Sequence, residues 1–307
     1  MTQKQILARN ARLPSLPELC LEVQMLADLP NTTASELGAV VSKDPALSTR
    51  LLKLVNSAYF GMPRKVDTLT RAINLIGIVE LRHLTLAASA REVFADIDSR
   101  LFDMAAFWQH SVYCGLVARK LAEHASVLHS ERLFTSGLLH DIGRLLMLME
   151  LPDEMEAVVV QQHELSRDVC KLEIEQVGFD HAEAGETLLL HWNLPSNLCT
   201  SVRYHHEPEL ARDANLETAI LHVADQIAHS AQDVYRPENP RLYDPFRALL
   251  NAAENAEEIS TAALALSNAN AVSLGNVTQD SMVNAVKQAS ADFDQVLEII
   301  YPSVVYC

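Results

Sequence analysis

The stretch 137-GLLHDIGRLLM-147 places an adjacent histidine and aspartate in the middle of an apolar run. The leucines, isoleucine and methionine around them are typical core residues, so His140 and Asp141 are expected to lie inside the molecule. Removing an imidazole or a carboxylate from water without a partner costs several kcal/mol. The pair therefore needs partners, either ordinary hydrogen bonds or a metal ion, and the rest of the sequence has to decide between them.

The composition is that of a globular protein with ample core material. The chain has 307 residues, 49% hydrophobic and 21% charged, which is enough for one large or two ordinary domains. It contains no run of about 18 apolar residues, so no transmembrane helix is expected. The N-terminal segment 1–20 has basic residues but no apolar signal core. We therefore expect a cytoplasmic protein that does not bind membranes.

The formal net charge of −16 excludes one class of partner. A surface this acidic repels phosphate backbones, so we expect no binding to nucleic acid. A phosphate can still be held locally where a metal ion supplies positive charge.

The cysteines are scattered, odd in number and form no C-x-x-C pair. This pattern is typical of reduced thiols in a reducing compartment and predicts no structural zinc knuckle. The five positions are Cys20, Cys114, Cys170, Cys199 and Cys307.

Helical signals dominate the chain, which has only nine glycines and abundant alanine, leucine and glutamate. The best strand-like run, 156-EAVVVQQ-162, is short and lies in a helical context. The sequence therefore predicts an all-α fold. Apolar spacing and capping residues predict helices over 16–29, 32–43, 44–61, 67–77, 79–94, 102–125, 131–149, 152–164, 170–176, 181–191, 195–204 and 215–232.

Three parts are expected along the chain. Residues 1–95 form a helical bundle with short loops, and residues 96–232 form a helical core. The segment 233-DVYRPENPRLYDP-245 contains three prolines and is predicted to be an exposed loop. With the Ala- and Glu-rich residues 246–307 it makes up the third part, a C-terminal helical extension over 233–307.

Seven side chains in the middle of the chain are of the types that bind metals, and each lies on or at the end of a predicted helix. Imidazole and carboxylate together suit iron, manganese, zinc or nickel more than calcium. A carboxylate shared by two ions could hold them about 3.5–4 Å apart, the spacing used to activate a water for attack on a phosphoester. The seven are His110, His140, Asp141, His181, His205, His206 and Asp225.

Each of these residues also has an ordinary interpretation. Lone histidines on amphipathic helices, such as His83 and His163, are more often hydrogen-bonded core or surface residues. The pair His205-His206 could be an exposed helix end. Asp225 could pair with His222, three residues earlier on the same helix. What favours a metal is the order H…HD…H…HH…D, with every member on a helix.

That order resembles the HD superfamily of metal-dependent phosphohydrolases. A closer resemblance, to the HDOD family, extends from about Leu13 to about Ala231 and rests on several motifs in the family's order. It implies an HD-type helical core joined to an N-terminal helical bundle, and a bacterial signalling role as an output or scaffold module. HDOD domains resemble the HD-GYP cyclic-di-GMP phosphodiesterases but are generally regarded as lacking demonstrated hydrolase activity. The motifs are 44-DPALSTRLLKLVNSAYFG-61, 73-INLIGIVELRHLTL-86, 108-WQHSVYCG-115, 137-GLLHDIGRL-145, 178-GFDHAEAGETLLLHWNLP-195 and 204-YHHEP-208.

The resemblance also implies roles for residues. The seven side chains fall on the ligand positions of a dinuclear HD-GYP-like site, with Asp141 as the bridging carboxylate. Arg144 stands where HD-GYP enzymes usually carry a lysine, and its guanidinium could clasp a phosphate. Asp141 and Arg144 are therefore the candidate catalytic residues. The HD-GYP signature HHE-x-x-x-G-x-G-Y-P is absent, because the chain after His206 reads 207-EPELARDANL-216.

This sequence therefore keeps the ion site while losing the loop that recognises cyclic-di-GMP. We expect an HDOD-type signal-transduction module with a divalent metal, iron or manganese and one or two ions, and a signalling protein as partner. The alternative is a metal-dependent phosphohydrolase acting on a nucleotide or another phosphoester. A third interpretation is a sensor that binds a nucleotide without cleaving it.

Overall fold

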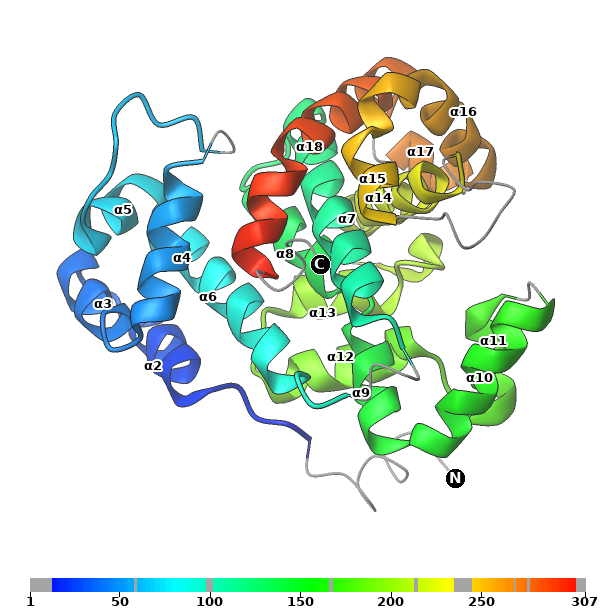
Figure 1. The fold of residues 1–307 in the computed structure, drawn as a ribbon, viewed down its shortest axis with the longest axis horizontal. Helices are drawn as coiled ribbons and strands as arrows, with labels where there is room; N and C mark the ends of the chain where they lie inside the picture. Colours follow the sequence, from blue (N-terminus) through cyan, green and yellow to red (C-terminus); the bar gives the residue numbers. More distant parts are fainter. Residues whose placement is uncertain are drawn as a thin grey trace.

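Helices joined by turns and irregular loops make up the part of the chain that the structure describes. The computed structural model describes residues 13–57, 60–97, 102–165, 168–212, 215–234, 245–267, 269–274 and 277–301. Within these ranges there is no strand, so the all-α prediction is confirmed (Figure 1). Most of the expected loop 233–245, together with Cys307 and the side chain of His163, lies outside the described residues.

In the N-terminal bundle, two helix starts carry the capping residues that the sequence predicts. Thr33 and Glu36 form a capping box at one helix start. Asp44 Oδ1 accepts the backbone N–H groups of Ala46 and Leu47 at another. Gly77, at φ +89°, separates the last two helices. The five helices are α2 (Glu18–Ala27), α3 (Ala34–Val41), α4 (Pro45–Val55), α5 (Leu69–Ile76) and α6 (Ile78–Val93).

The helical core comes next along the chain, and its long helix α7 lies at the centre of the molecule (Figure 1). Helix α7 packs against α8 and α14, and α9 packs against α12. The elements are α7 (Met104–His124), α8 (Glu131–Leu139), α9 (Ile142–Glu150), α10 (Pro152–Leu165), α11 (Val169–Gln176), α12 (His181–His191), α13 (Ser196–Arg203), the 3₁₀ turn η1 (Pro208–Leu210) and α14 (Asn215–Val234).

The single helix expected over 131–149 is wrong, because the structure breaks it at His140 and Asp141. Helix α8 ends at Leu139, and α9 begins at Ile142. Asp141 has φ −96° and ψ 6°, outside the helical region, and its side chain makes no capping hydrogen bond. The apolar run on both sides is continuous, so hydrophobic spacing alone did not reveal the break.

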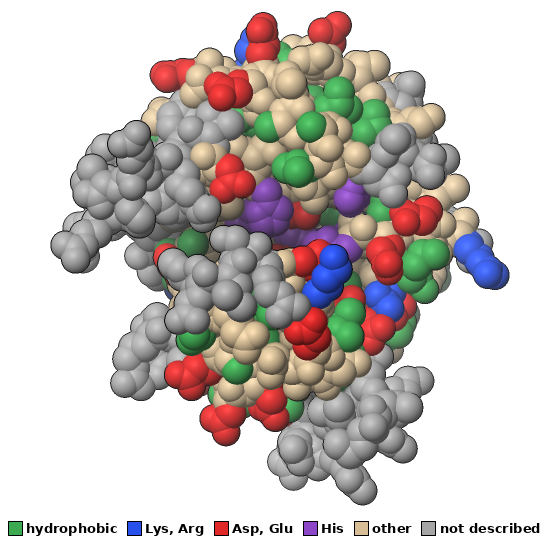
Figure 2. Space-filling view, turned by 90° about the vertical axis from the view of Figure 1, so that its right-hand side faces the viewer, with side chains coloured by type: hydrophobic (Ala, Val, Ile, Leu, Met, Phe, Trp, Pro, Cys, Tyr) green, Lys and Arg blue, Asp and Glu red, His purple; other side chains and the backbone are tan. Residues whose placement is uncertain are grey.

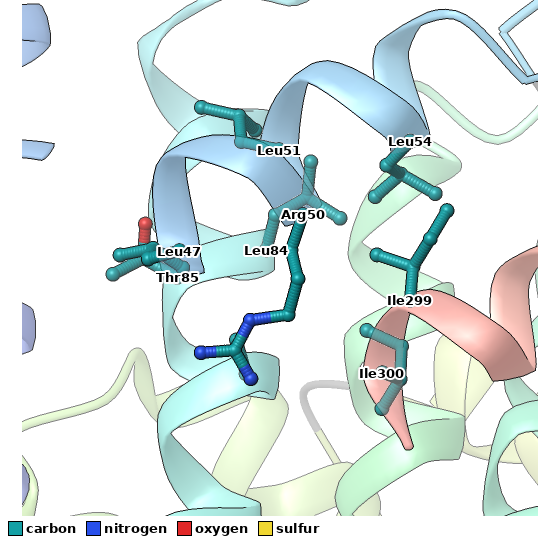
Figure 3. A pocket seen from close by; sticks show the side chains of 9 residues that line it. Leu47, Arg50, Leu51, Leu54, Leu84, Thr85, Ile299 and Ile300 are labelled. Atoms are coloured by element: carbon teal, nitrogen blue, oxygen red, sulfur yellow. The ribbon is translucent and has the colours of Figure 1, made fainter. Parts of the chain in front are cut away.

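The C-terminal helices pack onto the core and also reach the N-terminal bundle. On the last helix, Ser290 Oγ lies 3.1 Å from the buried Tyr113 hydroxyl of α7. The end of this helix brings Ile299 and Ile300 against Leu51 and Leu54 of α4 (Figure 3). The elements are α15 (Pro245–Leu250), η3 (Ala252–Asn255), α16 (Ala256–Leu266), α17 (Ala269–Leu274) and α18 (Gln279–Ile300). The division into 1–95, 96–232 and 233–307 stays a prediction.

Two helix contacts near the His-Asp break depend on glycine. A Cβ on Gly137 of α8 would lie 2.5 Å from the Cα of Gly115 on α7. A Cβ on Gly143 of α9 would overlap the carbonyl oxygen of His181 and lie 2.5 Å from the backbone nitrogen of Gly185 on α12. Only glycine therefore lets α7 and α12 approach the two helices that flank His140 and Asp141.

The described helices include none that is by itself long and apolar enough to cross a membrane. The pair α5 and α6, which is bent by 112°, reaches the necessary length and composition only when its two helices are taken together.

A buried carboxylate joins the N-terminal bundle to the core. Glu80 of α6 is 4% exposed, and its Oε1 lies 3.7 Å from Nη1 of Arg119 on α7. Burial raises the pKa of Glu80 to about 7 even though Arg119 opposes the shift. The folded protein therefore holds a proton here that the unfolded chain releases at lower pH.

Replacing Glu80 with glutamine should remove a pH dependence of stability. The folded pKa of Glu80 is about 7 and its ordinary value 4.5, so its contribution to stability falls as pH rises through this window. Glutamine does not titrate, so the unfolding free energy of Glu80→Gln relative to wild type should rise by about 2 kcal/mol between pH 5 and pH 8. Urea unfolding of both proteins at the two pH values measures this difference.

Glu123→Gln is the matched control, because Glu123 pairs with the same Arg119 from the exposed side at 3.0 Å. Its relative stability should change much less with pH, since exposed ion pairs contribute little. A Glu80→Gln difference that stays constant between pH 5 and pH 8 would contradict the prediction.

Candidate metal centre

The structure brings all seven predicted site residues together, although they come from distant segments. His110 lies on α7, His181 is the first residue of α12, and Asp225 lies on α14. His140 and Asp141 occupy the break between α8 and α9, and His205 and His206 follow Tyr204, the residue that caps the end of α13. Figure 2 shows histidine side chains at the bottom of a hollow, with acidic and basic side chains at its rim.

The ligand atoms form two neighbouring groups, in each of which all atoms lie within 4.8 Å of one another. The first group has four donors and the second has three. The first is Asp141, His181, His205 and His206, and the second is His110, His140 and Asp225. Six of the seven residues are buried, and His206 is half-buried.

Three of the histidine rings have a fixed orientation. His140 Nδ1 donates to the carbonyl oxygen of Gly137 at 2.7 Å, and His205 Nδ1 donates to that of Val202 at the same distance. His181 Nδ1 lies 2.7 Å from the carboxylate of Glu173. A carbonyl or carboxylate oxygen can only accept, so Nδ1 of each ring carries a proton and Nε2 faces the site, with a lone pair whenever the ring is neutral.

These Nε2 atoms point at carboxylate oxygen. Asp141 Oδ1 lies 3.1 Å from Nε2 of His181, 3.5 Å from that of His140 and 3.7 Å from that of His205. The Nε2 atoms of His140 and His205 are buried and have no hydrogen-bond partner among the described residues. Lone pairs that face a carboxylate repel it unless a proton or a cation lies between them.

Two imidazoles also meet at the site. His206 Nε2 lies 2.9 Å from His181 Nε2. Because His181 uses Nδ1 for Glu173, its neutral ring offers Nε2 as an acceptor, which either an Nε2–H of His206 or a cation can meet. A divalent ion would bind both lone pairs, and the donor set fits a metal of the iron, manganese or zinc type.

The electrostatics of the described residues also favour a cation at the site. Burial would raise the pKa of Asp141, yet His140 and His181 hold it well below its usual range. Burial would lower the pKa of His181, yet Glu173 and Asp141 raise it to about 10. The site thus stabilises positive charge beside its carboxylates, and a metal ion would supply that charge.

His205 and His206 remain neutral instead. Burial, followed by the neighbouring His206, lowers the pKa of His205 well below its usual value. Burial and His181 lower the pKa of His206 to about 4. Neutral imidazole is the form that binds metal, so both rings are in the required state near neutral pH.

Arg144 lies at the edge of the site. Its Nη1 is 3.8 Å from Asp141 Oδ2, and its Nη2 donates to Gln162 Oε1 at 3.4 Å. The guanidinium carbon lies 5.3 Å from the centre of the Phe102 ring. A guanidinium held in this way next to the carboxylate can meet an anion at the mouth of the site.

Two residues that the sequence prediction missed contact the site directly. Glu173 is fully buried on α11 and accepts both the backbone N–H and the Nδ1–H of His181. No local pattern marked this residue, since it lies eight positions before its partner. His229 lies 3.3 Å from Asp225 Oδ1 and could have been found, because a spacing of four places both on one helix face.

His222, which the sequence offered as a partner of Asp225, also contacts the backbone at the site. His222 Nδ1 donates to the carbonyl oxygen of His205 at 2.8 Å and so supports the chain next to His206. Asp225 itself faces His110, His140 and His229, which come from three different helices or helix ends. His83, the lone histidine of α6, is buried away from the two groups.

Comparison with known proteins gives matches along most of the chain. A curated relative, an uncharacterized protein from Treponema pallidum (strain Nichols), is 30% identical over 198 residues, which is 63% of this chain and 37% of the relative. The match thus spans little more than a third of that relative's length. Its name says nothing about activity.

Solved structures share the fold. A "Putative phosphohydrolase" from Shewanella amazonensis SB2B has a TM-score of 0.70 and 24% identity, covering 95% of this chain and 97% of its own. An HDOD domain protein of unknown function from Geobacter sulfurreducens has a TM-score of 0.67 and 20% identity, covering 94% and 96%. A "Putative signal transduction protein" from Marinobacter aquaeolei VT8 has a TM-score of 0.68 and 16% identity, covering 96% and 63%.

The family is shown by the sequence match and agrees with the architecture. The HDOD domain family matches residues 13–208, well over half of the chain. The solved HDOD domain protein from Geobacter sulfurreducens has the same helical fold over nearly its whole length. The chain therefore belongs to the HDOD domain family.

Proposed function

We propose that this chain is a signal-transduction module of the HDOD family that has kept a divalent metal centre. The observation that carries the proposal is the convergence of three ring nitrogens on the single oxygen Asp141 Oδ1, at 3.1, 3.5 and 3.7 Å. A histidine kept only for packing does not need its Nδ1 bonded to an acceptor so that Nε2 faces a carboxylate.

Iron or manganese is the proposed metal, as one or two ions. The two ligand groups contain only imidazole nitrogen and carboxylate oxygen. Such mixed donor sets suit these metals, whereas calcium prefers oxygen alone. A bound ion would act as a Lewis acid and lower the pKa of a coordinated water.

A role in signalling is favoured over cyclic-di-GMP hydrolysis by the segment directly after His206. Residues 208–210 form a short 3₁₀ turn, and the described part of 207–212 contains no glycine. The glycine-rich substrate loop of HD-GYP enzymes therefore has no counterpart at that position. We propose that the chain transmits its state to a protein partner in the cytoplasm, and the net charge of −16 makes nucleic acid an unsuitable partner.

Phosphoester hydrolysis is the second candidate, and Arg144 is the observation that favours it. Its guanidinium lies beside Asp141 at the edge of the site, where it could hold a phosphate against the ions. In this candidate, Asp141 would hold the metal and Arg144 would bind the substrate.

Elemental analysis of the protein purified without chelator tests the proposal. We expect one to two equivalents of iron or manganese per chain, and a higher melting temperature with added Mn²⁺ than after treatment with chelator, because an ion bound only by the folded state stabilises it. A chain that stays metal-free after reconstitution, with an unchanged melting temperature, would contradict the metal centre. Turnover of a generic phosphoester by the loaded protein, lost in Arg144→Ala, would favour hydrolysis over signalling alone.

A further inference from the structure

His229 lies at the solvent side of the candidate metal centre. It is on α14, four residues after Asp225, and its side chain is 50% exposed. Its Nε2 lies 3.3 Å from Asp225 Oδ1. Its ring centre lies 4.5 Å from that of His110, with the planes tilted by 39°. His229 therefore reaches the second ligand group, which consists of His110, His140 and Asp225, from outside.

The two ligand groups are not equally complete. The first has four protein donors, while the second has three buried donors. In the second group Asp225 Oδ2 is buried without a hydrogen-bond partner among the described residues. A metal bound there by three side chains would have room for another protein donor.

The distances around Asp225 Oδ1 resemble those within a coordination shell. Nε2 of His110, His229 and His140 lie 3.1, 3.3 and 3.4 Å from this oxygen. Metal–nitrogen bonds of about 2.0–2.1 Å place neighbouring ligand atoms of a tetrahedral ion about 3.3 Å apart. The three imidazoles thus keep from Asp225 Oδ1 the separation that ligands of one ion keep from each other. His229 lies outside the set of donors that are all within 4.8 Å of one another, so its ring has to move inward to share the ion.

The exposed ring of His229 can adjust to an ion, whereas one buried ring of the second group is held. His229 contacts the second group through Asp225 and is half exposed, so its side chain can rotate when an ion binds. His140 is fixed by its bond to Gly137. This combination of a held buried donor and an adjustable exposed donor allows an ion to enter from solvent.

We propose that His229 is the fourth protein ligand of the ion in the second group and that this ion binds more weakly than the ion in the first group. The inference rests on the metal centre proposed above and adds a ligand and an order of loading to it. The ion is a divalent transition metal, because three of the four donors are imidazoles.

The weaker binding is a consequence of how the rings are held. In the first group, His181 and His205 have Nδ1 bonded to Glu173 and to a backbone carbonyl. In the second, His140 has such a bond to the Gly137 carbonyl, but His110 Nδ1 is buried and has no partner among the described residues. Outer hydrogen bonds of this kind contribute about 10–100-fold to metal affinity. His229 must also lose the freedom of an exposed side chain when it binds.

The proposal is tested by titrating the metal-free chain with Mn²⁺ and measuring the free ion by electron paramagnetic resonance. Wild type should bind two ions with distinct affinities. His229→Ala should leave the tighter dissociation constant within about two-fold of wild type and raise the weaker one at least about ten-fold, the lower limit for loss of a supporting partner. His229→Gln should behave in the same way, because glutamine keeps polarity and size but lacks the imidazole.

The control is His124→Ala, which removes an exposed histidine from the end of α7 and should bind both ions as wild type does. Unchanged affinities in His229→Ala would overturn the inference while leaving the metal centre intact. Full recovery in His229→Gln would overturn it as well, since it would assign His229 a polar packing role. Wild type that binds no Mn²⁺ would overturn the metal centre and this ligand together.

Discussion

Asparagine in place of Asp141 is expected to remove the bound metal. Asp141 Oδ1 is the oxygen on which the ring nitrogens of three histidines converge, between 3.1 and 3.7 Å. Asparagine keeps the volume but not the charge, so the first ligand group would lose its only carboxylate. We expect affinity for Mn²⁺ to fall by more than about 100-fold, beyond the effect of losing an outer-shell partner. Elemental analysis and Mn²⁺ titration of the variant measure the loss.

Asp292→Asn provides the matched control for this substitution. Asp292 is a similarly enclosed carboxylate, 9% exposed on α18, that faces Lys120 at 3.8 Å. The control should keep the full metal content, and circular dichroism should show that both variants are folded. If Asp141→Asn retains the metal of the wild type, the seven residues do not form a site centred on Asp141.

A single methyl group at residue 143 should disrupt both the fold and the site. In Gly143→Ala the new Cβ would overlap the carbonyl oxygen of His181, which is backbone and cannot rotate away. Helices α9 and α12 would have to separate, and they begin next to Asp141 and at His181 respectively. We expect destabilisation of more than about 3 kcal/mol, at the upper end for overpacking. Urea unfolding of the metal-free protein measures it.

Gly38→Ala tests whether the loss of stability in Gly143→Ala comes from the close contact between α9 and α12 and not from replacing a helical glycine in general. Gly38 lies within α3, and the nearest atom to an added Cβ is the Thr70 hydroxyl oxygen at 3.2 Å, a side-chain atom that can move. Alanine also favours helix over glycine by about 1 kcal/mol, so this variant should remain close to wild type. Equal stability of Gly143→Ala and wild type would mean that the approach of α9 to α12 is not tight.

The sequence predicted the helical elements because their signals are local. Thr33, Asp44 and Gly77 each act within one turn of their own position, as caps or as a break between helices. The metal-type residues were also recognisable, since polar pairs inside apolar runs are rare. The break at His140 could not be seen, because Leu139 and Ile142 continue the same apolar face on either side.

The partners made by packing could not be predicted from the sequence alone. Glu173 meets His181 only because the chain turns between the end of α11 and the start of α12, and nothing around Glu173 in the sequence indicates this contact. The approach of α9 to α12 likewise depends on a backbone distance that the composition of 137–147 does not encode. The contact of His229 with Asp225 could have been predicted, since the two residues are four positions apart on one helix.

The contact between α7 and α18 has a consequence for how this chain is made. Tyr113 and Ser290 are 177 residues apart, and the bond from Trp192 to the carbonyl of Pro14 spans 178. At about 5–20 residues per second, a ribosome needs roughly 9–35 seconds to produce the intervening chain. During that interval the apolar surface of α7 that later meets Phe293 has no native cover. Until α18 leaves the ribosome, this apolar surface of the nascent protein is therefore open to contacts that the folded chain does not allow.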